Sequence, residues 1–245
     1  FGDIIGNAAN LAVFVRQAIN NGLQFSWLSK AKIRYVLRKY AYFPKYNLLP
    51  VLMASSSYFL PAIFINKFYG QEAAGYFDLS KMLLSVPLAL GGSALASVLL
   101  QRYAEKYRER ISISKEISLL FFAVSGLAML EIAIIWWFGV DIFTLFFGEK
   151  WAYSGTLSQI LVWSYALNFI VSTFSSIFVA LQRIKLYSAW QVLYFGGIGM
   201  LVFASYLPFE TFIQWFVAVE ISAYVLVLAA SIYVVHGYEK SLKRN

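Results

Sequence analysis

The stretch "GYFDLSKMLLSVPLALGG", residues 75–92, decides the class of fold, because it looks like the start of a membrane-spanning helix yet contains two charges. Asp78 and Lys81 lie one helical turn apart, and at about 100° per residue they share a helix face with Ser85. That face continues with an alanine and a glycine, whereas the opposite face is rich in leucine. A charge that faces lipid costs at least about 2.5–3.5 kcal/mol. We therefore expect the small, polar face to look into protein or water.

The composition indicates a membrane protein rather than a soluble one. Of the 245 residues, 60% are hydrophobic and 13% are charged, and the mean hydropathy is +0.67. Soluble domains are about 45–50% apolar and about 25% charged, so the apolar surplus exceeds what a soluble core could bury. The chain is therefore expected to be a polytopic membrane protein.

Residue types that many catalytic and metal sites need are scarce. The chain has no cysteine, which excludes disulfides, thiol catalysis and cysteine-ligated metals. The single histidine, His236, falls in the polar C-terminal tail, where we expect it to be solvated, and one histidine cannot form a site with several histidine ligands. We therefore expect neither a metal nor a cofactor.

Six continuous apolar runs are each long enough for a helix that crosses a bilayer core about 30 Å thick, which takes roughly 20 residues. They are 47–66, 74–101, 116–138, 156–181, 188–207 and 211–235. A β-barrel would instead show alternating segments of about 10 residues. We therefore predict an all-α fold with about six full transmembrane helices in residues 47–235. Pro50, Pro61 and Pro87 fall in or near the first two runs, where proline bends a helix by removing a backbone hydrogen bond.

The N-terminal part resembles a connection to another part of a longer protein. Residues 4–20 form a weaker apolar run, interrupted by two asparagines and Arg16, and the chain begins with Phe. We expect residues 1–20 to be the end of a preceding transmembrane helix. Residues 21–46 interleave basic and aromatic side chains, which is typical of an interfacial helix on an anionic leaflet and equally of an ordinary cytoplasmic linker.

The basic residues are concentrated on one side of the predicted membrane. Sixteen of the 20 Lys and Arg residues fall in the segments 21–46, 102–115, 182–187 and 236–245. Segments rich in Lys and Arg stay on the cytoplasmic side, so the run at 47–66 should lead outward, the next inward, and the C-terminal tail should be cytoplasmic. The net charge of +8 is thereby explained by a membrane surface and not by nucleic acid.

Two further acidic residues, Glu131 and Glu220, are embedded in apolar runs. In the predicted topology, Lys81 and both glutamates lie at a similar depth, roughly 10 Å below the outer boundary at 1.5 Å per residue. We therefore expect a shared cavity, in which Lys81 meets an anionic substrate and a carboxylate titrates or binds a cation. The alternative is a structural ion pair between Lys81 and Asp78 or one of the glutamates.

An enzyme is the less favoured interpretation. A Ser–His–Asp triad would lack an intramembrane histidine, and no glycine-rich phosphate loop is present. "GGIG" at 196–199 lies in an apolar run, where small residues usually serve helix packing. The longest outer connection, 139–155, is short for a membrane transferase. We expect a transporter, with a membrane glycosyl- or acyltransferase or a channel-like scaffold as alternatives from other classes.

Three segments, taken in order, resemble a known family. Residues 40–87, "YAYFPKYNLLPVLMASSSYFLPAIFINKFYGQEAAGYFDLSKMLLSVP", contain a Tyr-x-x-Phe-Pro-like entry, then Ala-Gly-Tyr-Phe, a basic residue and a proline. Residues 145–161, "LFFGEKWAYSGTLSQIL", are similar to a Leu-Phe-Gly-x-x-Trp-x-x-Ala-Gly segment, with Ser154 in place of the usual alanine, and "QRYAE" at 101–105 fits the end of a helix. Together they resemble the C-terminal half of bacterial polysaccharide-export proteins, the O-antigen and capsule flippases of the multidrug/oligosaccharidyl-lipid/polysaccharide exporter superfamily.

The resemblance implies one lobe of a two-lobed exporter that has about twelve or more helices. Such a flippase moves polyprenyl-diphosphate-linked oligosaccharide, an O-antigen (lipopolysaccharide) or capsule repeat unit, across the bacterial inner membrane by alternating access. The residues 21–46 would connect the lobes. The expected partners are the lipid-linked substrate, membrane lipids and other polysaccharide-assembly membrane proteins. A sister exporter for a peptidoglycan lipid precursor or for drugs is the nearest alternative.

The resemblance also suggests roles for individual residues. Lys81 stands where the family often has Arg or Lys, which makes it the first candidate for binding the substrate diphosphate. Asp78, as its local counter-charge, and Ser85, on the same face, complete the candidate substrate site. Glu131 and Glu220 are the candidates for coupling transport to an ion.

The charge asymmetry predicts that the connection at 102–115 and the C-terminal tail both lie in the cytoplasm. Reporter domains fused after Tyr107 and after Lys240 should each give a cytoplasmic signal, because translocating flanking Lys and Arg residues is disfavoured. A periplasmic signal at both fusion points would reverse the topology.

Overall fold

The computed structural model describes residues 2–20, 29–40 and 44–243, and every regular element in these ranges is helical. The chain divides into two compact units, Phe1–Lys45 and Tyr46–Asn245, which are described separately. The all-α class predicted from the apolar runs is confirmed for the described residues.

The first unit contains α1 (Gly2–Asn20) and α2 (Lys30–Lys39). Ser29 caps α2, since its side chain accepts a hydrogen bond from the Lys32 backbone N–H at 3.2 Å. The described residues of α2 are all exposed, so this basic helix has no packed face within its unit. α1 is not among the described helices that are long and apolar enough to cross a membrane, and its role as the end of a preceding span stays a prediction.

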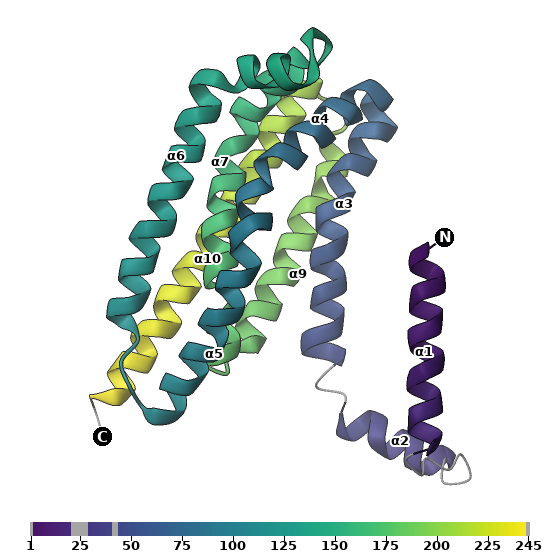
Figure 1. Cartoon of the computed structure of the whole chain (residues 1–245), viewed down its shortest axis with the longest axis vertical. Coiled ribbons are helices and arrows are strands. Elements are labelled where there is room, and N and C mark those ends of the chain that lie inside the picture. The colour runs from purple at the N-terminus through teal and green to yellow at the C-terminus, as the bar shows by residue number, and fades with distance from the viewer. Residues whose placement is uncertain (1, 21–28, 41–43, 244–245) are drawn as a thin grey trace. The chain divides into compact units, whose positions relative to one another are not determined.

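The second unit is a bundle of long helices joined by short turns (Figure 1). The turn η2 (Pro44–Leu48) begins in the first unit and ends in the second. The remaining elements of the second unit, in chain order, are α3 (Leu49–Tyr69), α4 (Gln71–Leu84), η3 (Leu88–Gly92), α5 (Ser93–Glu109), α6 (Ser114–Phe147), η4 (Glu149–Trp151), α7 (Ala152–Phe174), α8 (Ser176–Ala180), α9 (Ile184–Met200), η5 (Leu201–Ala204) and α10 (Phe209–Leu242). The label η marks short 3-10 or π-helical turns.

Five segments of this bundle, among the described residues, have the length and composition of membrane spans. They are Leu49–Tyr69, Ser114–Phe147, Glu149–Ala180, Ile184–Ala204 and Phe209–Leu242. A sixth is obtained if α4 and the helix at Leu88–Glu109 count as one span that bends by 42°. Each of the five falls on one of the predicted apolar runs, and the bent pair covers the remaining one.

The bend between α4 and α5 follows from Pro87. α4 ends at Leu84, Ser85 forms a turn, and the chain resumes a helical course at Val86 and Pro87. Proline has no backbone N–H, so the hydrogen bond that would continue the helix past this point cannot form. The sequence predicted one continuous polar face over residues 78–92. The bend interrupts this face, because its last two residues, Ala89 and Gly92, lie beyond the bend.

The turns at one end of the bundle depend on two glycines. Gly70 separates α3 from α4 with φ 92°, and Gly148 separates α6 from η4 with φ 91°. Positive φ is strained for residues with a Cβ, so each glycine lets the chain reverse within one or two residues. The predicted 139–155 connection is consequently much shorter than expected, because α6 continues as far as Phe147.

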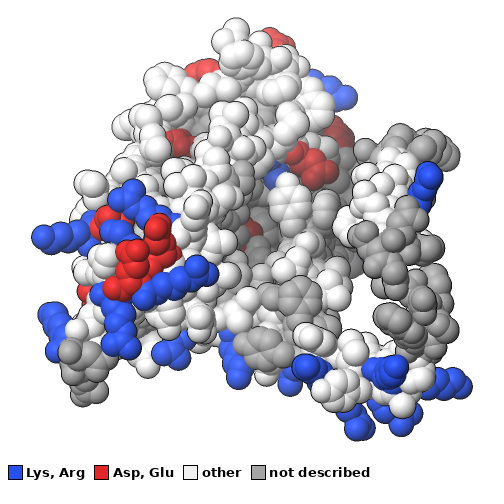
Figure 2. All heavy atoms as spheres, turned by 60° about the horizontal axis from the view of Figure 1, so that its bottom comes forward, with Lys and Arg blue, Asp and Glu red and all other residues white. Residues whose placement is uncertain are grey.

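The two ends of the second unit differ in charge. The turns α5–α6 and α8–α9 and the end of α10 carry most of its basic side chains, and Figure 2 shows blue side chains gathered on this face. These residues are Arg102, Lys106, Arg108, Arg110, Lys115, Arg183, Lys185, Lys240 and Lys243. The opposite end has Lys67 and Lys150 together with several carboxylates. We call the first of these the basic end.

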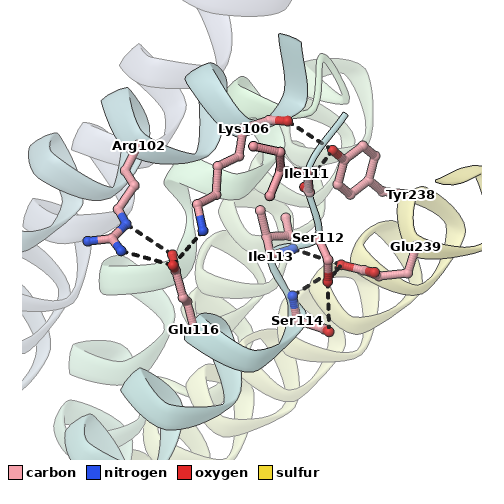
Figure 3. A network of polar contacts seen from close by, with 9 residues as sticks. All are labelled: Arg102, Lys106, Ile111, Ser112, Ile113, Ser114, Glu116, Tyr238 and Glu239. Carbon is pink, nitrogen blue, oxygen red and sulfur yellow. Dashed lines mark hydrogen bonds and ion pairs between the residues drawn. The ribbon is translucent and has the colours of Figure 1, made fainter. Parts of the chain in front are cut away.

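Polar contacts fasten the turn between α5 and α6 to the end of α10 (Figure 3). The Glu239 carboxylate accepts hydrogen bonds from the Ser112 hydroxyl and from the backbone N–H groups of Ile113 and Ser114. It thereby satisfies N–H groups at the start of α6, which have no partner within the helix. Beside it, Glu116 accepts from both Arg102 and Lys106.

α6 and α7 pack against each other at close range. A Cβ added to Gly155 would lie 2.5 Å from the Val140 Cα and 2.8 Å from the Gly139 carbonyl oxygen. Small residues let membrane helices approach in this way, and the gain is van der Waals packing because lipid tails are as apolar as leucine. The opposite side of α6 presents exposed apolar residues, among them Phe122, Met129 and Trp137, as a lipid-facing surface does.

We predict that Gly155→Ala lowers the thermal unfolding midpoint of the detergent-solubilised protein, by about 1–3 kcal/mol in stability, because backbone atoms must move apart. Gly126→Ala on α6 is the matched control, since its added Cβ would meet nothing within 4 Å and alanine is the better helix former. Equal midpoints for both variants would contradict the close crossing.

Candidate functional site

A cavity of about 180 Å³ lies within the second unit, between α3, α4, α7, α9 and α10. Lys81 and Glu220, two of the three charges predicted to share a cavity, both line it. Most of the other lining side chains are aromatic: Tyr58, Phe77, Tyr165, Tyr187, Trp190, Tyr194, Phe216 and Tyr224. The remainder are small or neutral: Ala54, Ser57, Pro61, Asn168 and Gln191.

Lys81 is buried, with 7% of its surface exposed. Its Nζ donates a hydrogen bond to the Tyr58 carbonyl oxygen at 2.6 Å and lies 3.2 Å from the centroid of the Tyr58 ring. The ring face is electron-rich and attracts a cation, the more strongly where water is excluded. An ammonium group has three donors, so the carbonyl accounts for one and leaves capacity for an anion in the cavity.

Asp78 and Ser85 do not line the cavity. Asp78 is exposed, and the ion pairs within 4.0 Å among the described residues do not include a pair with Lys81. Its charge acts on the ammonium only at longer range, as does that of Glu220. The Ser85 hydroxyl donates to the Met82 carbonyl at 2.9 Å. Their predicted part in substrate binding therefore gains no support from their positions.

The reason is the direction of the buried face of α4. The face that packs into the bundle consists of Ala74, Phe77, Ser80, Lys81 and Leu84. Helical spacing alone predicted that Lys81 shares a face with Asp78 and Ser85. In the bundle the buried face of α4 lies on the other side of Lys81, where Phe77 and Leu84 are. Lys81 is thus a buried cation on a mostly apolar face.

Glu220 is buried on α10, with 6% of its surface exposed. One carboxylate oxygen, Oε1, accepts hydrogen bonds from the Tyr194 hydroxyl at 2.9 Å and from the Tyr224 hydroxyl at 3.2 Å. A buried carboxylate without partners would be expensive, and these two phenols supply them. Their rings lie 5.7 Å apart between centroids, which fixes the donors around the acid.

Glu131 does not share the cavity. It is half-buried on α6, and its Oε2 is a buried atom without a hydrogen-bond partner among the described residues. The predicted cavity of three charges is therefore found with two of them. Position along a helix gives the depth of a residue, but the direction of its side chain depends on how the helix is rotated in the bundle.

The sequence interpretation missed a row of stacked aromatic rings along α9. Tyr187 stacks on Trp190 at 5.4 Å, and Trp190 stacks on Tyr194 at 5.6 Å with the rings 3° from parallel. Phe178 extends the row at 5.3 Å from Tyr187. The sequence did contain a signal for this row. Tyr187, Trp190 and Tyr194 are spaced by three and four residues, which puts them on one face of a helix.

The Trp190 indole N–H donates to the Ala223 carbonyl at 2.7 Å, which ties this row to α10. The rings therefore form a fixed wall of the cavity.

Among the described residues, no group of three or more His, Cys, Asp or Glu side chains is arranged to hold a metal ion.

Comparisons of this chain with protein-family models, with curated proteins and with solved structures give no significant match. The candidate site therefore has to be interpreted from its own geometry.

We predict that Tyr194→Phe and Tyr224→Phe each destabilise the protein by about 1 kcal/mol, because each removes a hydrogen bond from the buried Glu220 carboxylate. Tyr233→Phe is the matched control on α10, since that side chain is 75% exposed. Thermal unfolding in detergent measures all three. In a double-mutant cycle, Glu220→Leu removes the acceptor oxygens, so Tyr194→Phe should cost much less stability in the Glu220→Leu background than in the parent. An equal cost in both backgrounds would contradict the contact.

Proposed function

We propose that this chain is part of a flippase that moves polyprenyl-diphosphate-linked oligosaccharide, such as an O-antigen or capsule repeat unit, across the bacterial inner membrane. It would serve polysaccharide biosynthesis as a transporter, not as an enzyme. The observation that supports the proposal is the buried Lys81 ammonium beside a wall of stacked aromatic rings, within a bundle of helices long enough to cross a membrane.

The two halves of such a substrate match the two kinds of lining. A diphosphate is an anion that accepts charge-assisted hydrogen bonds, which are roughly twice as strong as neutral ones, and Lys81 is the cation in the cavity. A sugar ring presents hydroxyl groups and C–H edges, which suit the phenol hydroxyls and ring edges of tyrosines in the lining such as Tyr165 and Tyr194. The polyprenyl tail can remain in the bilayer.

In this proposal the cavity has to widen before the substrate can enter. Pockets that hold a drug-sized ligand measure about 300–1,000 Å³, whereas this cavity measures about 180 Å³. An oligosaccharide could enter only after the helices separate. Pro61 within α3 and the 42° bend beside Pro87 are positions where a helix can flex, because a backbone hydrogen bond is already missing there.

Glu220 is the better placed of the two candidates for ion coupling. It lines the same cavity as Lys81, whereas Glu131 does not. A carboxylate that faces the substrate path can bind a proton or a cation in one state and release it in the other. Glu131 has a buried oxygen with no hydrogen-bond partner among the described residues, so it remains a second candidate outside the cavity.

One observation favours a second candidate function, a sister exporter of amphipathic cations such as drugs. Glu220 lies among aromatic rings, and such an arrangement binds organic cations through ring faces and a carboxylate. A peptidoglycan lipid precursor, which also has a diphosphate, would use Lys81 in the same way as the main proposal. A glycosyl- or acyltransferase is less well supported, because the turns between the described spans are short.

In this proposal the basic end faces the cytoplasm, and so does the C-terminus. The membrane is the bacterial inner membrane, and the chain would form one lobe of a larger exporter. Its partners are the lipid-linked substrate, the surrounding lipids and other membrane proteins of polysaccharide assembly.

We predict that Lys81→Ala abolishes most flipping of a fluorescent lipid-linked oligosaccharide by the full-length protein in proteoliposomes, while Lys81→Arg retains a large part because the positive charge is kept. Lys67→Ala is the matched control, since Lys67 is exposed on α3, and it should flip at the rate of the parent.

The double change Asp78→Ala with Lys81→Ala separates substrate binding from a structural role. Because the described structure has no direct ion pair between them, removing Asp78 should not restore flipping. Restored flipping and restored protein level in the double variant would show that Lys81 is only a structural partner, and the proposed substrate role would be lost.

A further inference from the structure

A second, polar cleft of about 750 Å³ opens at the basic end of the second unit. Residues from the end of α5, the α5–α6 turn, the α8–α9 turn and the end of α10 line it. It shares no residue with the cavity around Lys81. Arg108 and Arg110 are its cationic side chains, and Tyr107 and Gln182 add neutral polar groups.

The backbone of this cleft is strained at two positions. Arg110 and Gln182, each with φ 57°, are the non-glycine residues with positive φ in the described part of the chain, and both line the cleft. A left-handed conformation costs an L-residue roughly 1–2 kcal/mol, and glycine is the usual residue at such a helix end. Strained residues of this kind are frequent at functional sites. The strain at Arg110 and Gln182 therefore makes the cleft a candidate binding site.

The turn that carries Arg110 is held in place. The Tyr238 hydroxyl donates to the Ile111 carbonyl at 2.9 Å and to the Lys106 carbonyl at 3.1 Å (Figure 3). The Ile111 backbone N–H also donates to the Lys106 carbonyl, at 2.9 Å. These contacts fix the α5–α6 turn against α10, so the cleft is formed before any ligand arrives.

Neither arginine forms an ion pair within 4.0 Å with a carboxylate of the described residues. The ion pairs found among the described residues join Arg102 and Lys106 to Glu116, and they include neither Arg108 nor Arg110. Both arginines line the cleft and are exposed. A guanidinium offers several N–H donors in a planar fork that matches the oxygens of a phosphate.

We infer that this cleft binds a phosphate group at the membrane surface. The anionic leaflet on the basic side of a membrane protein supplies such groups, and basic pockets between helices on that side bind lipid headgroups. The volume is large enough for a phosphodiester headgroup, and the apolar residues of the lining, such as Val179 and Leu242, can contact its acyl ester region. Free phosphate has the same chemistry, and the test separates the two sources.

The test uses the full-length protein in detergent and measures retention of phosphatidylglycerol by native mass spectrometry, with diacylglycerol, which has no phosphate, as the neutral lipid. The test variant is Arg108→Gln/Arg110→Gln. The matched control, Lys115→Gln/Lys240→Gln, removes two charges from the same end at residues that do not line the cleft. We expect at least about a tenfold loss of phosphatidylglycerol affinity in the arginine variant, since charge-assisted hydrogen bonds are lost, and less than about a twofold change in the control.

A second arm adds millimolar inorganic phosphate. Phosphatidylglycerol that stays bound in its presence supports the lipid headgroup as the source. Arginine-dependent binding of phosphate, with displacement of the lipid, supports the same site with free phosphate as the source. An equal loss of phosphatidylglycerol affinity in the arginine variant and the lysine control would mean that only the overall positive charge of this end attracts the lipid, and it would overturn the site. Unchanged lipid binding in the arginine variant would overturn it as well. If the double variant does not fold, Arg108→Gln alone, which leaves the strained turn unaltered, gives the same decision.

Discussion

Hydrocarbon offers no hydrogen-bond partner to a peptide group, and this constraint governs the whole second unit. A chain in lipid must close its backbone hydrogen bonds within helices, so the described spans are long and the reversals between them lie at their ends. Such abrupt turns require unusual backbone conformations, which Gly70 and Gly148 supply at one end and Arg110 and Gln182 at the other. The one bend of more than 40° within a described span, beside Pro87, lies where a backbone donor is missing from the sequence.

The same constraint applies to charged side chains and explains how the cavity is built. Lys81 and Glu220 lie away from water within the bundle, and each is given partners by the protein: a carbonyl oxygen and a ring face for Lys81, and the hydroxyls of Tyr194 and Tyr224 for Glu220. Neither charge neutralises the other by direct contact among the described ion pairs. Both groups line the same cavity.

The basic end is organised differently, because there the charges are exposed. Glu116 and Glu239 hold the α5–α6 turn through ion pairs and through backbone N–H groups. Surface ion pairs contribute little energy individually, so their effect is chiefly to set the position of the turn. The cleft with Arg108 and Arg110 lies beside this fixed turn. It shares no residue with the buried cavity around Lys81.

The sequence by itself determined the helical membrane class, the positions of the apolar spans and the charge difference between the ends, because these depend on composition and on properties repeated over twenty residues. It also singled out Lys81 and Glu220, since any charge within an apolar run is conspicuous. Only the tertiary structure decided that these two share a cavity while Glu131 does not, and that Asp78 remains exposed beside Lys81. The physical reason is that helical spacing gives the relative angles of residues on one helix, whereas the rotation of each helix is fixed by packing against its neighbours, as at the close contact of Gly155 with α6.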